Sequence, residues 1–432
     1  MDMKRSLPFV FAAALLCTTP QRAVAQDAAQ LKAQEEARAM LKIRHVKSER
    51  LNGANMNMTR VKSELASSGT TKAASLPLFL YDIESSRDNN NYTGVIVGAD
   101  PFSHRGEKDV HVPTFIVPLI ITVNTVGVNW DPKTGTFQTA PGTMTFDPTI
   151  PTSCFAPPNN VPLTLTQQSP IFGRATYSVG GTEVGDTQYI DSLQRAEFWE
   201  ALGDNHIRDD YHLRLSPVRT LPAVQINVPA AMGTTLPVNP FNACEGLGIV
   251  DFNWFDNYLQ TVLIPQLQTA GVNPANFPIL LTHNVVTAVA PITFVGDCCF
   301  LGYHNFTGTP IQTYSPSDFD TTGVFGGPAN GDTDTLAHEV GEWANDPFVT
   351  NPVPAWGNSG QTQGFCQTNL EVGDPLSGTN FSPIVMPNGF TYHLQELAFF
   401  SWFYGAPGVG IHGWFSNNGT FLTDAGPVCS LN

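Results

Sequence analysis

The chain has 432 residues and a formal net charge of −16 at pH 7, with 37 Asp and Glu against 21 Lys and Arg. The last Lys or Arg is Arg219, and the 213 residues after it contain 15 Asp and Glu. An acidic surface of this kind makes nucleic acid and anionic membranes poor partners.

The first 25 residues have the composition of a secretory signal peptide. Lys4 and Arg5 give a positive start, residues 7–16 are apolar, and Ala23-Val24-Ala25 is typical of a cleavage site. The apolar run is too short to span a membrane, and no later stretch is long and apolar enough to do so. The chain is therefore predicted to be secreted or periplasmic, with Cys17 leaving a lipid-anchored form as an alternative.

Residues 26–75 differ in composition from everything after them. Strong helix formers and charged residues fill the stretch from 27 to about 51, and a linker rich in Ser, Thr, Gly and Ala runs from 66 to 75. The segment is either a propeptide or a solvated spacer. The lack of a legible processing site favours the spacer.

From residue 76 onward the chain has the Pro, Gly, Phe and Val content of a folded exported protein. We expect an α+β fold in two parts, a β-rich N-terminal region over residues 76–219 and a second domain over residues 220–432. In the first part, the pattern predicts a strand over 112–126, Pro- and Thr-rich connections over 127–171 and a helix over 188–202.

The second part alternates predicted strands and helices. The strands are expected over 223–228, 277–290, 300–306 and 311–314, and the helices over 252–267, with a kink at its proline, and over 332–345. The last helix is expected to begin with Asp332 or Asp334 as its N-cap and to end at Asp346-Pro347. A further apolar helix is expected from His393 to Phe403.

Six cysteines remain after the signal peptide, and an even number in an exported chain favours disulfide bonds. Cys298 and Cys299 are adjacent, so we expect each of them to pair with a distant partner. Cys366 and Cys429 are the candidates for those partners, and Cys154 with Cys244 completes the set.

Residues 338–342, His-Glu-Val-Gly-Glu, nearly match the H-E-x-x-H helix of zinc peptidases, with Glu342 in place of the second histidine. Residues four apart share a helix face, so His338 and Glu342 can bind one ion together. Glu339 lies one step round the helix, at the position of the general base in such enzymes.

The alternative is that residues 338–342 belong to a helix that merely begins with acidic side chains and binds no metal. If a metal is bound, the carboxylate makes the site more anionic and less selective among Zn²⁺, Mn²⁺ and Ca²⁺, and the hydrolase slower.

These residues resemble the zincin metallopeptidase superfamily in a variant with Glu for His. The pattern of His338 to Glu342 followed by Asn345-Asp346-Pro347 and Ala355-Trp356 is also similar to the secreted plant Exordium, or phosphate-induced, proteins. The resemblance covers residues 220–432 and implies a zincin-like domain, in which a mixed sheet supports the metal-binding helix.

The resemblance also implies a third ligand downstream, a Glu followed shortly by an Asp. Glu371 and Asp374 fit this pattern. Glu371 would bind the ion, and Asp374 would accept the second ring N–H of His338 and fix its tautomer. His393 is the alternative third ligand. Asp346 lies one more four-residue step along the helix face and is expected to cap or orient.

No Lys or Arg follows residue 219, so an oxyanion donor has to be another group. His393 or Tyr392 is expected to fill that role. His304, within the strand predicted over 300–306, is expected to border a substrate cleft. Tryptophan and phenylalanine residues near the motif are interpreted as core packing, with an aromatic sugar-binding cleft as the alternative.

The leading hypothesis is a secreted metal-dependent peptidase-like protein, with Zn²⁺ or another divalent ion at His338, Glu342 and Glu371. Glu339 would activate water for attack on a peptide or protein substrate, or on a cell-surface polymer. The competing hypothesis is a non-catalytic exported binding or cell-surface module with a structural or lost metal site.

Overall fold

The computed structural model describes residues 75–432, apart from 104–107, 204, 238–240, 290, 296–297, 358–365, 406–407 and 430–432. The predicted signal peptide and almost all of the predicted propeptide or spacer lie outside the described residues, so both stay predictions.

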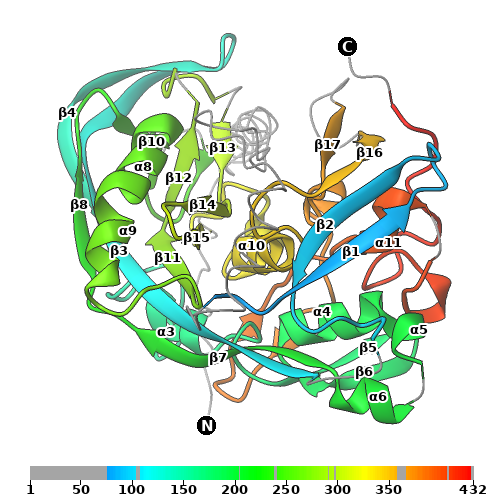
Figure 1. Ribbon diagram of the computed structural model, residues 1–432. Coiled ribbons are helices and arrows are strands. Elements are labelled where there is room, and N and C mark those ends of the chain that lie inside the picture. Colours follow the sequence, from blue (N-terminus) through cyan, green and yellow to red (C-terminus); the bar gives the residue numbers. More distant parts are fainter. Residues whose placement is uncertain are drawn as a thin grey trace, which may run out of the picture.

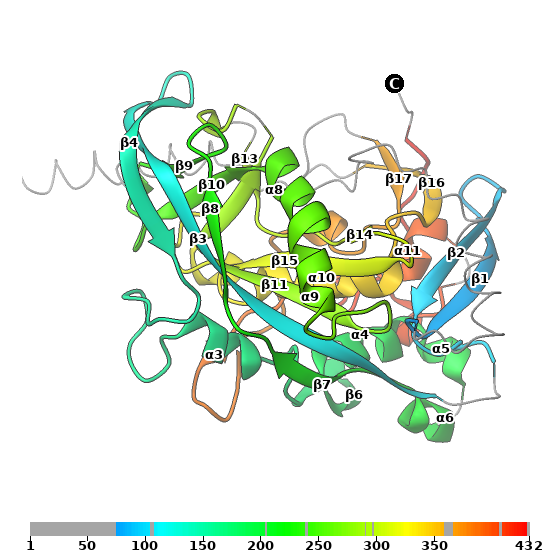
Figure 2. The same ribbon diagram turned by 60° about the vertical axis from the view of Figure 1, so that its left-hand side comes forward.

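The largest sheet has seven strands in the order β14-β15-β11-β3-β4, with β7 and β8 also paired with β3. Its strands are β3 (Asp109–Asp131), β4 (Thr136–Phe146), β7 (His212–Thr220), β8 (Val224–Val228), β11 (Phe277–His283), β14 (Asn305–Thr307) and β15 (Gln312–Phe319). Figure 2 shows the long strand β3 curving through the sheet.

Strand β3 is longer at both ends than the strand predicted over 112–126, because different neighbouring strands pair with its two halves. β7 and β11 pair with its first half in parallel, whereas parallel β8 and antiparallel β4 pair with its second half. The apolar residues 115–121 are covered on both faces, as is usual for parallel strands. The expectation that Pro- and Thr-rich connections fill most of 127–171 was wrong, since the end of β3, all of β4 and the helix α3 (Pro162–Gln167) lie there.

A second sheet has the order β13-β12-β10-β9 and contains β9 (Gly233–Leu236), β10 (Leu247–Asp251), β12 (Val285–Ala288) and β13 (Cys298–Phe300). The single strand expected over 277–290 is therefore two strands, β11 and β12, in two different sheets. Asn284 lies between them with φ of 54°, a left-handed conformation that asparagine adopts more readily than most residues. Its side-chain oxygen accepts the backbone N–H of Thr321 at 2.7 Å, which holds the turn in place.

Two-stranded pairs and short helices complete the described part of the chain. The pairs are β1 (Leu78–Glu84) with β2 (Asn91–Val97), β5 (Ala175–Val179) with β6 (Thr182–Thr187), β16 (Pro352–Trp356) with β17 (Gln367–Asn369), and β18 (Ile384–Val385) with β19 (Thr391–Tyr392). The helices are α4 (Tyr189–Glu197), α5 (Trp199–Leu202), α6 (Asn205–Asp210), α8 (Phe252–Tyr258), η1 (Leu259–Leu263), α9 (Ile264–Gln268), η3 (Gly327–Asn330), α10 (Asp334–Asn345), η4 (Asp374–Leu376), α11 (Phe400–Tyr404) and η5 (Ile411–Gly413).

Most predicted helices are found, with changed limits. The helix expected over 188–202 is divided at Phe198 into α4 and α5. The expected kink in 252–267 is the π-helical turn η1, which immediately precedes the turn that contains Pro265. The helix expected from His393 to Phe403 was wrong, because only α11 forms there.

Helix α10 lies in the centre of the molecule, where β15, β2 and α4 contact it (Figure 1). It ends at Asp346, as predicted, but the expected acidic N-cap was wrong. Thr333 holds the N-cap position and makes no side-chain cap. The ring of Trp343 stacks on Phe277, with centroids 3.9 Å apart, which anchors α10 to the main sheet. Trp343 and most of the neighbouring aromatic side chains belong to the same buried core.

The cysteines pair differently from the prediction. Cys154 bonds to Cys244, as expected. Cys366 and Cys429 bond to each other, with Cα atoms 6.1 Å apart, and Cys298 bonds to its neighbour Cys299. The expectation that the adjacent cysteines reach distant partners was wrong, since those partners are joined together.

The fold is mixed α+β and rich in strands, in agreement with the predicted class. Strands from both sides of residue 219 share the seven-stranded sheet, so the two predicted parts are joined by one continuous sheet. Among the described residues, no helix has the length and apolarity needed to cross a membrane.

Candidate metal centre

Helix α10 carries the motif residues into the interior of the protein. All 12 of its residues are buried, including His338, Glu339 and Glu342. Gly341 makes this burial feasible, because a Cβ atom there would lie 2.1 Å from Cδ1 of Leu397. Buried polar side chains need polar partners, and the partners of these three come from three other segments of the chain.

His338 and Glu342 lie against each other on one face of α10, as their spacing predicts. Nε2 of His338 is 3.0 Å from Oε1 of Glu342, and the two side chains are 1% and 3% exposed. The same oxygen accepts the backbone N–H of Gly373 at 3.1 Å. Burial lowers the pKa of His338, but the neighbouring Glu342, Glu339 and Asp374 outweigh it and raise the pKa to about 10. Without a metal, the pair is therefore an imidazolium bound to a carboxylate.

The segment between β17 and η4 brings the two downstream acids to this pair. Burial, together with the charges of Glu342 and Asp374, raises the pKa of Glu371 well above its usual range. The interaction between the two carboxyl groups raises the pKa of Glu371 and lowers that of Glu342. Asp374 lies near the His338–Glu342 pair. One ligand atom from each of His338, Glu342 and Asp374 forms a group within 4.8 Å.

Gln395, which the sequence did not single out, orients His338. Its side-chain N–H donates to the carbonyl oxygen of Gly373 at 2.6 Å, and its Oε1 then lies 3.0 Å from Nδ1 of His338. Nδ1 therefore donates a proton, and Nε2 is the nitrogen that faces Glu342 and any bound ion. This is the role that the sequence had assigned to Asp374. A Cβ atom at Gly373 would lie 2.4 Å from Nδ1, so glycine is required for the ring to fit.

His304 is the second imidazole of the cluster, although the sequence placed it only at the border of a cleft. Its Nδ1 lies 3.6 Å from Oε2 of Glu339 and 3.6 Å from Oε2 of Glu342. Burial lowers the pKa of His304, but the charges and hydrogen bonding of these two acids outweigh it, and the pKa is raised. For the acid Glu339, burial has the opposite effect and raises the pKa.

Asp346 positions His304 from the end of α10. Nε2 of His304 lies 3.0 Å from the carbonyl oxygen of Asp346 and donates to it, so that Nδ1 faces the two acids. The carboxylate of Asp346 accepts the backbone N–H groups of Thr350 and Asn351, each at 2.9 Å. Its side chain thus caps the turn after the helix, and its main chain orients the imidazole.

His393 and Tyr392, the expected oxyanion donors, have other partners. Nδ1 of His393 lies 2.6 Å from Oδ2 of Asp332, and both residues line a cavity of about 470 Å³. The hydroxyl group of Tyr392 donates to the carbonyl oxygen of Leu165 at 2.8 Å. Among the described residues, His393 belongs to neither group of potential metal ligands. Glu371 also belongs to neither group, whereas Asp374 forms one with His338 and Glu342.

The cluster contains more acid than base. It combines two imidazoles with four carboxyl groups, all of them buried: His304, His338, Glu339, Glu342, Glu371 and Asp374. The half of the chain that supplies them has no Lys or Arg. Burying several carboxylates together is costly unless some are protonated or a cation neutralises them.

The atoms of the proposed ligands are close enough to bind one ion. Tetrahedral zinc ligands at about 2.0–2.2 Å from the ion lie about 3.4 Å from one another. Nε2 of His338 and Oε1 of Glu342 are 3.0 Å apart, and one ligand atom from each of His338, Glu342 and Asp374 lies within 4.8 Å of the others. Glu342 faces one imidazole with each of its two oxygens and so belongs to both potential ligand groups. Nitrogen and carboxylate donors suit zinc and also manganese, so the donor set fits a divalent ion without selecting one.

Comparison of the chain with protein-family models, with curated proteins and with solved structures gave no match.

Proposed function

We propose that this protein binds a divalent metal ion on α10, between His338, Glu342 and the segment that carries Glu371 and Asp374. The observation that carries the proposal is the buried excess of acid around two imidazoles, in a half-chain without Lys or Arg. A bound ion would be the largest positive charge in the cluster and would relieve the repulsion among the carboxylates.

We further propose that the metal centre supports hydrolysis of a peptide bond. A bound divalent ion polarises a carbonyl group and lowers the pKa of water. Glu339, which follows His338 on α10, would accept a proton from the attacking water. Burial raises its pKa, which suits a base that must later release that proton. His304, whose pKa is raised by Glu339 and Glu342 in spite of its burial, would supply the donor for the carbonyl oxygen.

The second candidate is a structural ion in a non-catalytic exported module. The burial of the cluster favours it, because each of the six side chains is almost entirely shielded from solvent. Structural metal sites are closed, whereas catalytic sites keep a position open for water or substrate. The two candidates share the same ligands and differ in whether Glu339 acts as a base.

Export is part of both candidates. The N-terminal composition and the three disulfide bonds fit an oxidising compartment, outside the cell or in the periplasm. The substrate of the hydrolytic candidate would be a peptide, a protein or a cell-surface polymer from that compartment.

The substitution Glu339→Gln tests the catalytic candidate. Casein and a library of quenched fluorescent peptides serve as substrates, and metal content is measured on the same samples. The hydrolytic proposal predicts that the variant keeps its metal and loses activity by roughly 100-fold or more, whereas Glu200→Gln, at an exposed position on α5, is unchanged. A metal-loaded wild-type protein that cleaves no peptide favours the structural ion. Full activity in Glu339→Gln would refute the assigned base.

A further inference from the structure

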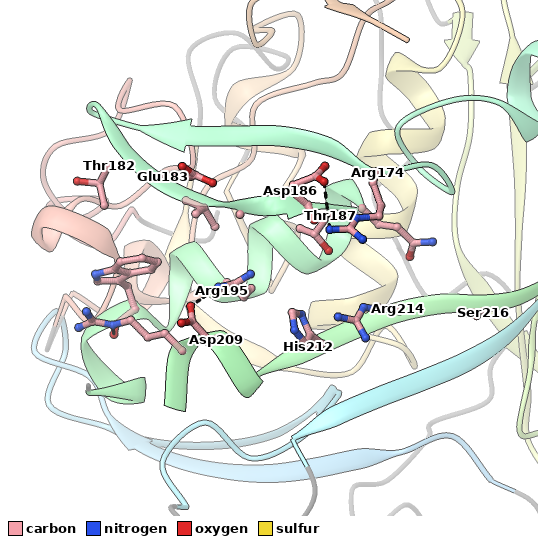
Figure 3. A pocket seen from close by; sticks show the side chains of 15 residues that line it. Arg174, Thr182, Glu183, Asp186, Thr187, Arg195, Asp209, His212, Arg214 and Ser216 are labelled. Atoms are coloured by element: carbon pink, nitrogen blue, oxygen red, sulfur yellow. Dashed lines mark hydrogen bonds and ion pairs between the residues drawn. The ribbon is translucent and has the colours of Figure 1, made fainter. Parts of the chain in front are cut away.

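A second polar site lies far along the chain from the metal cluster. A cavity of about 810 Å³ opens between the hairpin β5–β6, helix α4 and the start of β7 (Figure 3). Four arginines line it, namely Arg174, Arg195, Arg208 and Arg214, together with His212 and Trp199. A chain with a net charge of −16 thus gathers four of its 21 basic residues around one cavity.

Arg195 is the residue that distinguishes this cavity from an ordinary charged surface. It lies on α4 with only 8% of its side chain exposed, and its Nε has no hydrogen-bond partner among the described residues. In the part of the chain that the structure describes, its acidic partner is Asp209, 3.6 Å from Nη2 and 76% exposed. A buried guanidinium group usually has its donors satisfied, so this one lacks an acceptor.

The local backbone makes room for this guanidinium group. Gly185, on β6, faces the end of the Arg195 side chain, and a Cβ atom there would lie 2.5 Å from Nη1. Its φ of 147° is also one that other residues rarely adopt. A glycine at this point allows the arginine to reach the cavity wall.

The other cationic groups are already oriented. Nη1 of Arg214 lies 2.7 and 2.8 Å from the two carboxylate oxygens of Asp109. The guanidinium carbon of Arg208 lies 4.5 Å from the centre of the Trp199 ring, which stacks the two groups. Nδ1 of His212 is 2.9 Å from Asp191, which leaves Nε2 as the nitrogen for a ligand.

The three acidic residues that line the cavity are exposed to solvent. Asp186 pairs with Arg174 at 3.1 Å and is 53% exposed, and Asp209 lies 3.6 Å from Nη2 of Arg195 and is 76% exposed. Glu183 is also exposed. Exposed pairs of this kind contribute about 0–1 kcal/mol, so an incoming anion can replace them.

We propose that this cavity binds a small anionic ligand through carboxylate or phosphate oxygens, with Arg195 as its central contact. Arginine presents a planar fork that matches both groups, which is the chemistry that they share. The volume lies within the range of small-molecule sites, so there is room for an organic body beside the charged group, next to Trp199.

Calorimetric titration of the full chain tests the proposal, with inorganic phosphate in one arm and succinate in the other, at constant ionic strength. We expect saturable binding of at least one of them. Binding of phosphate alone would indicate a phosphate ester, binding of succinate alone would indicate a carboxylate, and binding of both would indicate a general oxyanion site.

Three variants locate the binding. Arg195→Lys keeps the charge but loses the fork, and we expect roughly tenfold weaker binding. Arg174→Gln, at a position 72% exposed, cannot disturb the core and should weaken binding roughly threefold. Arg219→Gln is the matched control, since this exposed arginine lies on the same strand as Arg214 but outside the cavity. Absence of saturable binding of either anion would overturn the proposal. It would also fail if both cavity variants bound like Arg219→Gln.

Discussion

The cluster around α10 and the arginine-lined cavity show opposite solutions to the placement of charge. In the first, two imidazoles and four carboxyl groups are buried with no Lys or Arg among them. In the second, four arginines surround a cavity that opens to solvent. Helix α4 packs against α10 and carries Arg195 at the cavity, so one helix connects the two regions. The comparison teaches that the cluster around α10 favours the binding of a cation, whereas the arginine-lined cavity favours the binding of an anion.

The largest effect is expected at the residue shared by both potential ligand groups. Glu342→Gln should abolish stoichiometric metal binding and lower the free energy of unfolding by about 3–5 kcal/mol, because the partners of a buried charge are left uncompensated. Elemental analysis and urea unfolding measure the two quantities. Glu183→Gln makes the same chemical change at the arginine-lined cavity and should alter neither. If Glu342→Gln kept its metal, the acidic cluster would not be the site.

Glu197, a buried acid at the end of α4, tests the other way to accommodate a buried carboxyl group, which is protonation. Burial raises the pKa of Glu197 to about 8, against about 4.5 for an ordinary glutamate. Because the folded-state pKa is the higher one, this group's contribution to stability is complete below pH 4.5 and is lost as the pH rises through 8.

From pH 4.5 to 7 the loss is roughly 3 kcal/mol. Glu197→Gln should remove this part of the pH dependence, so its stability relative to the wild type should increase with pH. The measurement is urea unfolding of both proteins at several pH values. A difference that stays constant with pH would show that Glu197 is ionised in the folded protein.

The two long-range disulfides should differ in what they do for the metal cluster. Cys366, in the Cys366–Cys429 bond, lies five residues before Glu371 in the sequence. The cysteines of the Cys154–Cys244 bond are distant from the ligands in sequence. Loss of either bond should cost about 2–4 kcal/mol, since both close long loops. Only the double variant Cys366→Ser/Cys429→Ser is expected to bind metal more weakly as well. Equal metal affinity in the two double-serine variants would show that the Cys366–Cys429 bond does not support the metal site.

The smallest of these effects is expected at Gln395. Gln395→Ala removes the acceptor at Nδ1 of His338 and should weaken metal binding by roughly 10–100-fold. Gln395→Glu restores an oxygen acceptor and should recover part of the affinity. Competition with a fluorescent chelator measures both variants. If alanine and glutamate had equal effects, the hydrogen bond to the ring would not be what orients it.

The part of the site that local spacing encodes could be predicted, and the part that depends on tertiary contacts could not. His338 and Glu342 are four residues apart on a helix, so their common face follows from helix geometry. Glu371 and Asp374 could be proposed because the family resemblance supplied a pattern. His304 and Gln395 reach the same cluster from other segments, and no sequence spacing relates them to the helix.

The fold shows the same division. The apolar run within β3 predicted a strand, but its full length depends on four partner strands that are distant in sequence. The adjacent cysteines were assigned to other partners because neighbouring side chains rarely meet, and sequence order alone did not reveal that Cys366 and Cys429 face each other. The residue pattern thus predicted most elements, whereas limits and pairings required the three-dimensional arrangement.

Metal analysis of the purified wild-type protein tests the central claim most directly. After extensive dialysis against metal-free buffer, we expect about one equivalent of a divalent transition metal per chain, removed by a strong chelator and restored by adding the ion back. A wild-type protein that retains no divalent ion and takes none up when zinc or manganese is added would contradict the account of the α10 cluster as a metal centre.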